Sequence, residues 1–239
     1  MKNQTKRKKY RFPMKILPLV LVGGIVAAVL VKADRHGDQK FESFSIRAIN
    51  SSSEKRAQER LDNILKMHPS QDVKDNLSHF LAERGGYISI ESMPDTPWAM
   101  GALGADYKDG RSVPILRINR DAVLDRANSD KKWQLVIYHE YQHLLDFVRG
   151  IEPPESFLVR DLSKISEQEA RRAFANELRA YLAQCRLAAS LHWESEFELC
   201  SSFTNGGEAG LRQVVAAQMA NDSRLARHRG LFLRLGEGN

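Results

Sequence analysis

The chain has 239 residues, with 36 Lys and Arg against 30 Asp and Glu, which gives a formal net charge of +6. This length allows one well-packed domain, or one domain with a small appendage. Residues 1–32 hold eight of the basic residues and no acidic one, so the remainder has 28 bases against 30 acids and a net charge of −2. The basic surplus belongs to the N-terminal tail, which excludes an overall nucleic-acid-binding charge on the rest of the chain.

The N-terminal tail has the pattern of a membrane-targeting segment. Residues 1–15 are rich in Lys and Arg, and residues 16–31 are uncharged and mostly apolar. Such a segment spans about 24 Å as a helix, which is short for a bilayer core of about 30 Å but can be accommodated. Because basic flanks stay in the cytoplasm, we expect a single-pass membrane protein with the following domain outside. The alternative is a signal peptide cleaved after Ala33 at the end of a targeting region 1–33, which would leave a secreted or periplasmic protein.

A polar linker is expected at 34–55, followed by one domain at 56–239. Helical spacing of apolar residues predicts helices at 54–68 and 70–86. The second of these ends at two glycines.

Three strands are predicted next, at 87–92, 98–107 and 112–119, with a tight hairpin between the last two. Pro114 lies inside the third strand and has no backbone N–H to donate. We therefore expect the strand at 112–119 at the edge of a small, mostly antiparallel sheet.

Beyond these strands the chain is predicted to be helical almost to its end. Helices are expected at 129–150, 166–191 and 210–228, the second of them starting with a capping box formed by Ser166 and Glu169. Strands followed by helices indicate an α+β fold with a C-terminal helical subdomain.

The helix predicted at 129–150 contains the sequence His139-Glu140-Tyr141-Gln142-His143. Residues four apart share one side of a helix, so both imidazoles can bind one metal ion. Glu140 flanks the same side and can take a proton from a metal-bound water, as in the H-E-x-x-H motif of zinc peptidases. The alternative is a pair of core histidines that are hydrogen-bonded to the backbone.

A catalytic zinc site has three protein ligands, so a third ligand is needed. Glu177 lies on the apolar side of the helix predicted at 166–191, where an unpaired carboxylate would be costly. Asp146, one turn after His143, is a second candidate. The alternative for Glu177 is an ion pair with a neighbouring arginine, for which the chain offers Arg171, Arg172 and Arg179.

The two motifs together resemble the gluzincin branch of the zinc metallopeptidases, to which thermolysin belongs. The resemblance covers His139-Glu140-x-x-His143 and the later Asn176-Glu177-x-x-Ala180, roughly residues 115–184. It implies a zincin-like fold in which His139, His143 and Glu177 hold one zinc ion and Glu140 is the general base. In that group an aspartate that orients the first histidine stands where this chain has Tyr181, so Tyr181 or a backbone carbonyl would have to serve.

The same resemblance implies that an edge strand beside the motif helix pairs with an extended peptide substrate, a role expected here of residues 112–119. The oxyanion of the reaction needs a further donor. The candidates are Tyr138, Tyr141, Tyr181, Arg179 and His192.

We therefore expect an extracytoplasmic zinc metallopeptidase, with a peptide or protein as partner, contact with the membrane through residues 16–31, and no nucleic-acid partner. Two alternatives remain: a membrane-tethered zincin-fold domain that binds without turnover, and an amidase of cell-wall peptides. Cys185 and Cys200 are candidates for a disulfide in an oxidising compartment, against two free buried thiols.

Overall fold

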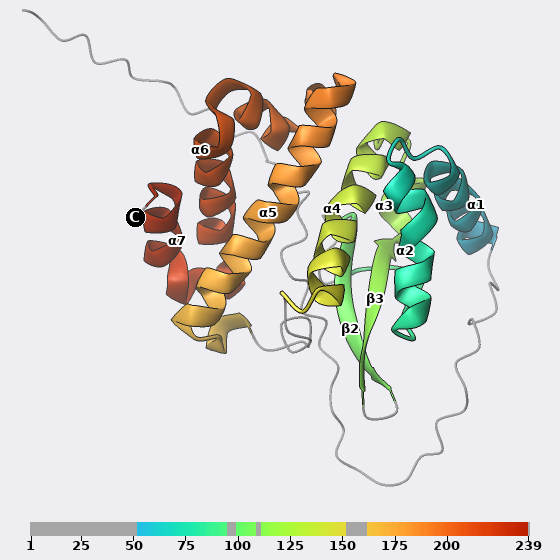
Figure 1. The fold of residues 1–239 in the computed structure, drawn as a ribbon, viewed down its shortest axis with the longest axis horizontal. Helices are drawn as coiled ribbons and strands as arrows, with labels where there is room; N and C mark the ends of the chain where they lie inside the picture. The colour runs from blue at the N-terminus through green and yellow to red at the C-terminus, as the bar shows by residue number, and fades with distance from the viewer. Residues whose placement is uncertain (1–51, 95–98, 109–110, 152–161, 239) are drawn as a thin grey trace, which may run out of the picture.

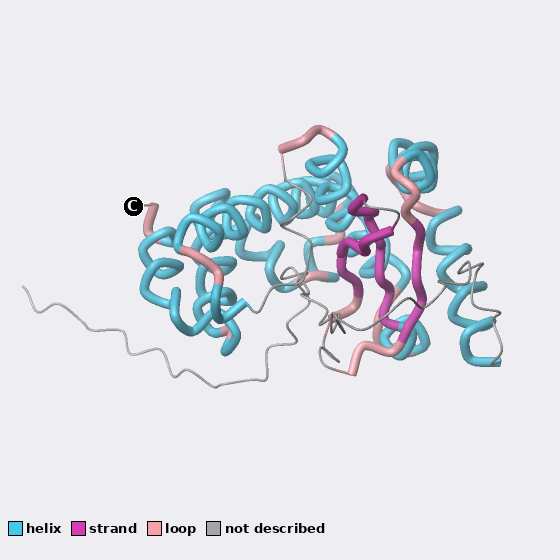
Figure 2. The backbone as a smooth tube through the Cα atoms, turned by 90° about the horizontal axis from the view of Figure 1, so that it is seen from below, coloured by secondary structure: helices cyan, strands magenta, loops and turns pink. Residues whose placement is uncertain are grey.

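The computed structural model describes residues 52–94, 99–108, 111–151 and 162–238 (Figure 1). Within these ranges the chain forms a mixed α+β fold that is mostly helical, with one small sheet. The strands lie in one half of the molecule, and the C-terminal helices gather in the other half (Figure 2). The α+β prediction is confirmed at this level.

Two helices precede the sheet, α1 (Ser52–Lys66) and α2 (Gln71–Glu83). Each buries one apolar stripe in the main core, and Ser70 caps α2 by accepting a hydrogen bond from the Val73 N–H. The turn between them is fixed by His68, which is buried. The backbone N–H of Ser70 donates to its Nδ1 at 3.1 Å, so its Nε2–H donates to the Gln134 carbonyl at 2.8 Å.

The sheet has three strands, β1 (Tyr87–Glu91), β2 (Gly101–Lys108) and β3 (Arg111–Asn119), in the order β1-β3-β2. β3 runs antiparallel to β2 and parallel to β1. The prediction of a mostly antiparallel sheet is therefore wrong. The hairpin fixes only the β2–β3 pairing, and β1 joins the opposite side of β3 in the parallel direction.

The predicted edge position of residues 112–119 is also wrong, because β3 is the central strand. Leu103 pairs with Leu116, and the Leu103 N–H points away from β3 toward Glu140, so the Leu116 N–H points away from β2 toward β1. Pro114 lies two residues before Leu116, so its nitrogen also faces β1. The first residue pair between β1 and β3 is Tyr87 with Ile115. Pro114 lies just before this pair, so its lack of an N–H costs the sheet little. Gly86 allows this close approach, since a Cβ there would lie 2.1 Å from the Pro114 carbonyl oxygen.

Helix α4 (Asp130–Val148) crosses the middle of the molecule and is joined to β3 by the short α3 (Arg120–Leu124). Eleven of the 19 residues of α4 are buried, because α1, α2, β2 and α5 all pack against it. Its N-terminus is capped by Ser129, which accepts from the Lys132 N–H. A helix enclosed on several sides holds its side chains in fixed positions, which suits it to carry a site.

The C-terminal half consists of α5 (Glu167–Leu191), α6 (Glu198–Asn221) and α7 (Arg229–Gly236). The predicted capping box of Ser166 and Glu169 is present at the start of α5. α5 packs against α4, and α6 and α7 lie beyond α5, away from the sheet (Figure 1). Residues 201–209, which precede the helix predicted at 210–228, are instead part of α6, which kinks at Gly207 with φ of +59°.

The expected single-pass membrane location needs correction. Among the four described ranges, no helix is both long enough and apolar enough to cross a membrane. The segment 16–31 that motivated the prediction, like the linker before residue 52, lies outside the described residues. This finding contradicts the predicted single-pass membrane location.

Candidate metal centre

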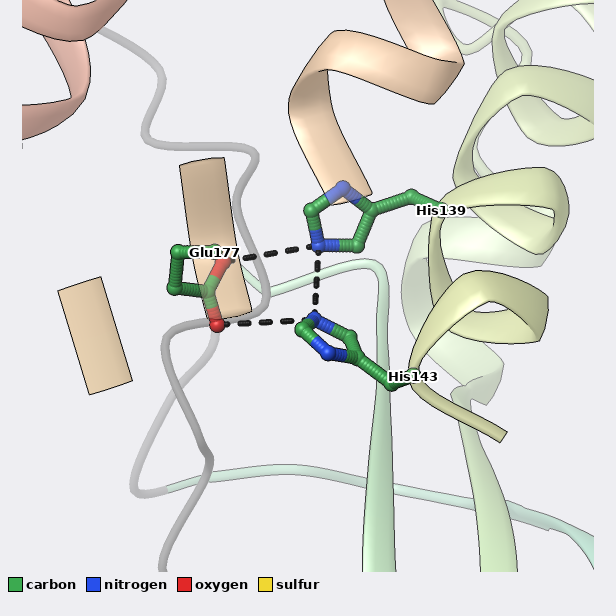
Figure 3. A group of neighbouring side chains, drawn as sticks. All are labelled: His139, His143 and Glu177. Atoms are coloured by element: carbon green, nitrogen blue, oxygen red, sulfur yellow. Dashed lines mark hydrogen bonds and ion pairs between the residues drawn. The ribbon is translucent and has the colours of Figure 1, made fainter. Parts of the chain in front are cut away.

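His139 and His143 lie one turn apart on the side of α4 that faces α5 (Figure 3). Their Nε2 atoms are 3.2 Å apart, and the rings meet edge to face with centroids 4.9 Å apart. Both side chains are buried, with exposures of 2% and 4%. The helical spacing thus directs both Nε2 atoms to a single point.

Glu177 reaches that point from α5, and its carboxylate faces both rings (Figure 3). Its oxygens lie 3.5 Å from His139 Nε2 and 3.6 Å from His143 Nε2. Among the described residues these three side chains form a group whose ligand atoms all lie within 4.8 Å of one another.

The spacing of these donor atoms fits a tetrahedral ion. Ligands bound at about 2.0–2.1 Å to a tetrahedral zinc lie about 3.3–3.4 Å from one another. Here the two Nε2 atoms are 3.2 Å apart, and each lies close to a different oxygen of Glu177, His139 Nε2 at 3.5 Å from Oε2 and His143 Nε2 at 3.6 Å from Oε1. Two imidazoles and one carboxylate are also a common donor set for zinc, with one coordination position left open. The residues present therefore fit a divalent metal such as zinc.

Burial controls the charge of this group. It lowers the pKa of His139 to about 3; the nearby Glu140 opposes this shift, and His143 adds to it. The His139 ring is thus neutral near pH 7, and its contact with Glu177 is not an ion pair. Two imidazole nitrogens and a carboxylate thus converge at the site, and such an arrangement is costly in a protein interior unless a proton or a cation lies between them.

Glu140 is held beside the group by the edge strand β2. Its Oε2 accepts a hydrogen bond from the Leu103 N–H at 2.7 Å, while its buried Oε1 has no hydrogen-bond partner among the described residues. Burial raises the pKa of the Glu140 carboxyl, and the two histidines partly offset this rise. One oxygen is therefore fixed by the backbone, and the other remains available to accept a proton.

The alternatives for the third ligand take other partners. Asp146 accepts from Arg179 Nη2 at 2.8 Å and is not part of the three-residue group. Arg171 pairs with Glu167 at 2.7 Å. Neither of these arginines is the partner of Glu177, whose carboxylate faces the two histidines instead.

Tyr181 lies against the group. Its ring is 4.4 Å from the His139 ring, centroid to centroid, and it is buried. Burial, followed by the charges of Glu177 and Glu140, raises the pKa of Tyr181 well above its ordinary value. The tyrosine is therefore neutral, and its ring packs on His139.

The other candidate donors do not meet the group. His192 is exposed and ends α5 in a left-handed conformation with φ of 57° and ψ of 45°. It comes 15 residues after Glu177, which is about 22 Å along the helix axis. Tyr141 donates to Asp72 on α2, and Tyr138 stacks near His68. Arg179 is engaged by Asp146, as described above.

A disulfide joins Cys185 on α5 to Cys200 on α6, with Cα atoms 4.9 Å apart. Both residues are fully buried. The bridge lies two turns beyond Glu177 and ties the helix that carries Glu177 to its neighbour.

Two participants were not anticipated from the sequence. The Leu103 N–H is a backbone group, so no residue type marks it, although the strand that carries it was predicted. Gln184 is buried on the same side of α5 as Glu177 and Tyr181. Its signal was available, because a polar residue seven positions after Glu177 continues the same helical face.

Comparison of the chain with protein-family models, with curated proteins and with solved structures finds no match. Function is therefore inferred from the geometry of the site.

Proposed function

We propose that this chain is a zinc-dependent metallopeptidase of the gluzincin type, with a zincin-like fold. The observation that carries the proposal is the convergence of His139, His143 and Glu177 at the spacing of a tetrahedral ion, next to Glu140. His139, His143 and Glu177 would hold the metal. Zinc bound there would supply Lewis-acid chemistry, polarising a substrate carbonyl and increasing the acidity of water.

Glu140 is suited to the proton transfers of peptide hydrolysis. Its Oε2 is held by the Leu103 N–H, so Oε1 can accept a proton from the attacking water. The same carboxyl can then deliver that proton to the leaving amine nitrogen.

An extended peptide would pair with the edge strand β2, whose Leu103 and Ala105 are only 4% and 5% exposed and would have to be uncovered first. The ladder with β3 turns the backbone groups of Gly101, Leu103 and Ala105 away from β3. The Leu103 N–H holds Glu140, which leaves the Leu103 carbonyl and the Ala105 backbone for a substrate strand. A peptide paired there would lie next to α4, and β2 thus takes the role first expected of residues 112–119.

One observation favours a rival function, a metal-binding domain without turnover. His139, Glu140, His143 and Glu177 are only 1–4% exposed, which resembles a closed structural site. Against this rival, a structural zinc site has four protein ligands, and the described residues offer three. A structural site also has no need for a carboxylate with an unpartnered oxygen.

The test combines metal analysis with a peptidase assay. Purified wild-type protein should bind one equivalent of zinc and cleave a broad set of fluorogenic peptides. Glu140→Gln should keep the zinc, because the amide still accepts from the Leu103 N–H, and hydrolysis should fall by about 10²–10⁴-fold. Stoichiometric zinc without cleavage of any peptide supports the rival, and cleavage that needs no metal contradicts the proposal.

A further inference from the structure

The side of α5 that carries Glu177 continues with two more buried polar side chains. Tyr181 and Gln184 follow four and seven residues later, so all three share one face of the helix. The Tyr181 ring already contacts the His139 ring. Gln184, only 1% exposed, is the next residue on this face.

His139 has a ring nitrogen on either side, and the two have different surroundings. Its Nε2 faces His143 and Glu177. Its Nδ1 is buried and has no hydrogen-bond partner among the described residues. A neutral imidazole that binds a metal through Nε2 carries its proton on Nδ1, and a buried N–H needs an acceptor.

Gln184 has an acceptor without a partner. Both atoms of its amide are buried and make no hydrogen bond with the described residues. Gln184 lies one turn beyond Tyr181, whose ring is 4.4 Å from the His139 ring, and its amide lies near the His139 ring but falls short of full hydrogen-bond geometry. Glutamine has three side-chain torsions, and a change of rotamer is the movement that the bond requires.

We propose that Gln184 is the positioning residue of His139, and that its Oε1 accepts a hydrogen bond from His139 Nδ1–H. The bond fixes the tautomer that leaves Nε2 free for the metal, and it fixes the direction of the ring. It also satisfies two buried polar atoms that otherwise lack partners. The inference rests on the metal site of the proposed function and requires no peptidase activity.

The first measurement is zinc affinity, determined by competition with a chelator. Gln184→Leu removes the acceptor at similar volume and should weaken zinc binding by about 10–100-fold. Gln184→Glu keeps an acceptor and should bind zinc at least as tightly as the wild type. Gln134→Leu is the matched control, because this buried glutamine bonds the Met67 carbonyl at 2.9 Å, away from the site. The control should lower the thermal midpoint and leave zinc affinity unchanged.

The second measurement separates positioning from simple packing. In the zinc-loaded wild type, the imidazole NMR spectrum should show a slowly exchanging Nδ1–H of His139. This signal should move downfield in Gln184→Glu and exchange rapidly in Gln184→Leu. Wild-type zinc affinity together with an unchanged Nδ1–H signal in Gln184→Leu would overturn the proposal.

A third measurement keeps the inference separate from the proposed function. If the wild type binds no zinc, the proposed function fails, and a double-mutant cycle of His139→Ala and Gln184→Leu in zinc-free protein decides the present proposal. A direct bond predicts that the double variant loses less thermal stability than the sum of the two single losses. Additive losses would show that the residues do not interact.

Discussion

The three metal-site side chains are hard to explain as core residues. An interior position costs a polar group several kcal/mol unless it gains a partner of matching chemistry. Here the Nε2 atoms of two imidazole rings and a carboxylate face one another at 3.2–3.6 Å. A divalent cation would supply the missing positive charge and so offset the cost of burying these groups.

Replacement of Glu177 gives the sharpest test at the residue scale. Glu177→Ala should reduce zinc content to near zero after dialysis, because two imidazoles alone hold the ion weakly. Metal content measured by mass spectrometry on the purified protein checks this prediction.

Asp146→Asn is the matched control for this change. Asp146 was the other candidate ligand and bonds Arg179 instead, so this variant should keep one equivalent of zinc. Full zinc in Glu177→Ala would remove Glu177 from the site.

The sequence predicted the site residues better than their surroundings. The spacing of His139 and His143 is a property of one helix, so it could be read from the sequence directly. That Glu177 meets them depends on how α5 packs on α4, which spacing alone does not determine. The carboxylate on the apolar side of its helix marked Glu177 as a candidate, and the resemblance implied the same ligand. His192 was attractive because it follows the Glu177 helix in sequence, but a helix of 25 residues carries its end far from its middle.

At the scale of elements, the strand prediction failed for an instructive reason. Proline is expected in edge strands because it has no backbone N–H to donate to a neighbouring strand. The lack of this N–H matters only at positions where a neighbouring strand is paired. In β3 the proline nitrogen lies on the β1 side at the start of the β1 ladder, so a central strand tolerates it. The direction of β1 could not be read either, because alternation of side chains is the same in parallel and antiparallel strands.

The disulfide should stabilise the α5–α6 pair. It joins positions 15 residues apart, and closure of such a loop contributes about 3 kcal/mol in the chain-entropy description. The double variant Cys185→Ala, Cys200→Ala should therefore lower the free energy of unfolding by about that amount, measured by urea denaturation.

Reduction of the wild type provides the control for the disulfide. Urea denaturation of wild-type protein with dithiothreitol should shift in the same direction as that of the double variant. A midpoint that is insensitive to the reductant would show that the bridge contributes nothing.

His68 should make the link between α1, α2 and α4 sensitive to acid. Burial lowers the pKa of His68 below 6.5, against the effect of its two backbone hydrogen bonds. Below about pH 6.5 the unfolded chain then binds more protons than the folded chain at this position, so the free energy of unfolding falls as the pH drops toward the folded pKa. Protonation would also remove the acceptor that His68 Nδ1 offers to the Ser70 N–H.

The measurement is the free energy of unfolding of metal-free wild type and of His68→Gln over a pH series. Titration of His139 affects both proteins equally and cancels in the difference. His68→Gln should lower the free energy of unfolding by about 1–3 kcal/mol at pH 7.5. This difference should narrow as the pH falls to 5, because the wild type loses the His68 contribution. A difference that stays constant over this range would mean that His68 does not titrate on unfolding.

At the scale of the whole molecule, the candidate metal centre lies where the two halves meet. α4 belongs with α1, α2 and the sheet, and α5 belongs with α6 and α7 (Figures 1 and 2). His139 and His143 come from the first half and Glu177 from the second. A metal bound there would connect the halves directly, so its effect should extend beyond the site.

Zinc should therefore stabilise the fold and do so most clearly along α4 and α5. Free zinc at 100 times its dissociation constant adds about 2.7 kcal/mol if it binds only the folded state. For a domain of this size that corresponds to an increase of roughly 5–11 °C in the thermal midpoint. Hydrogen exchange should slow in α4 and α5 on addition of zinc, while the outer helix α7, which contributes no ligand, changes least.

Glu177→Gln is the control, because it removes one ligand between the halves at nearly constant volume. Zinc should change neither the thermal midpoint nor the hydrogen exchange of this variant. An equal rise in that variant would place the bound zinc elsewhere.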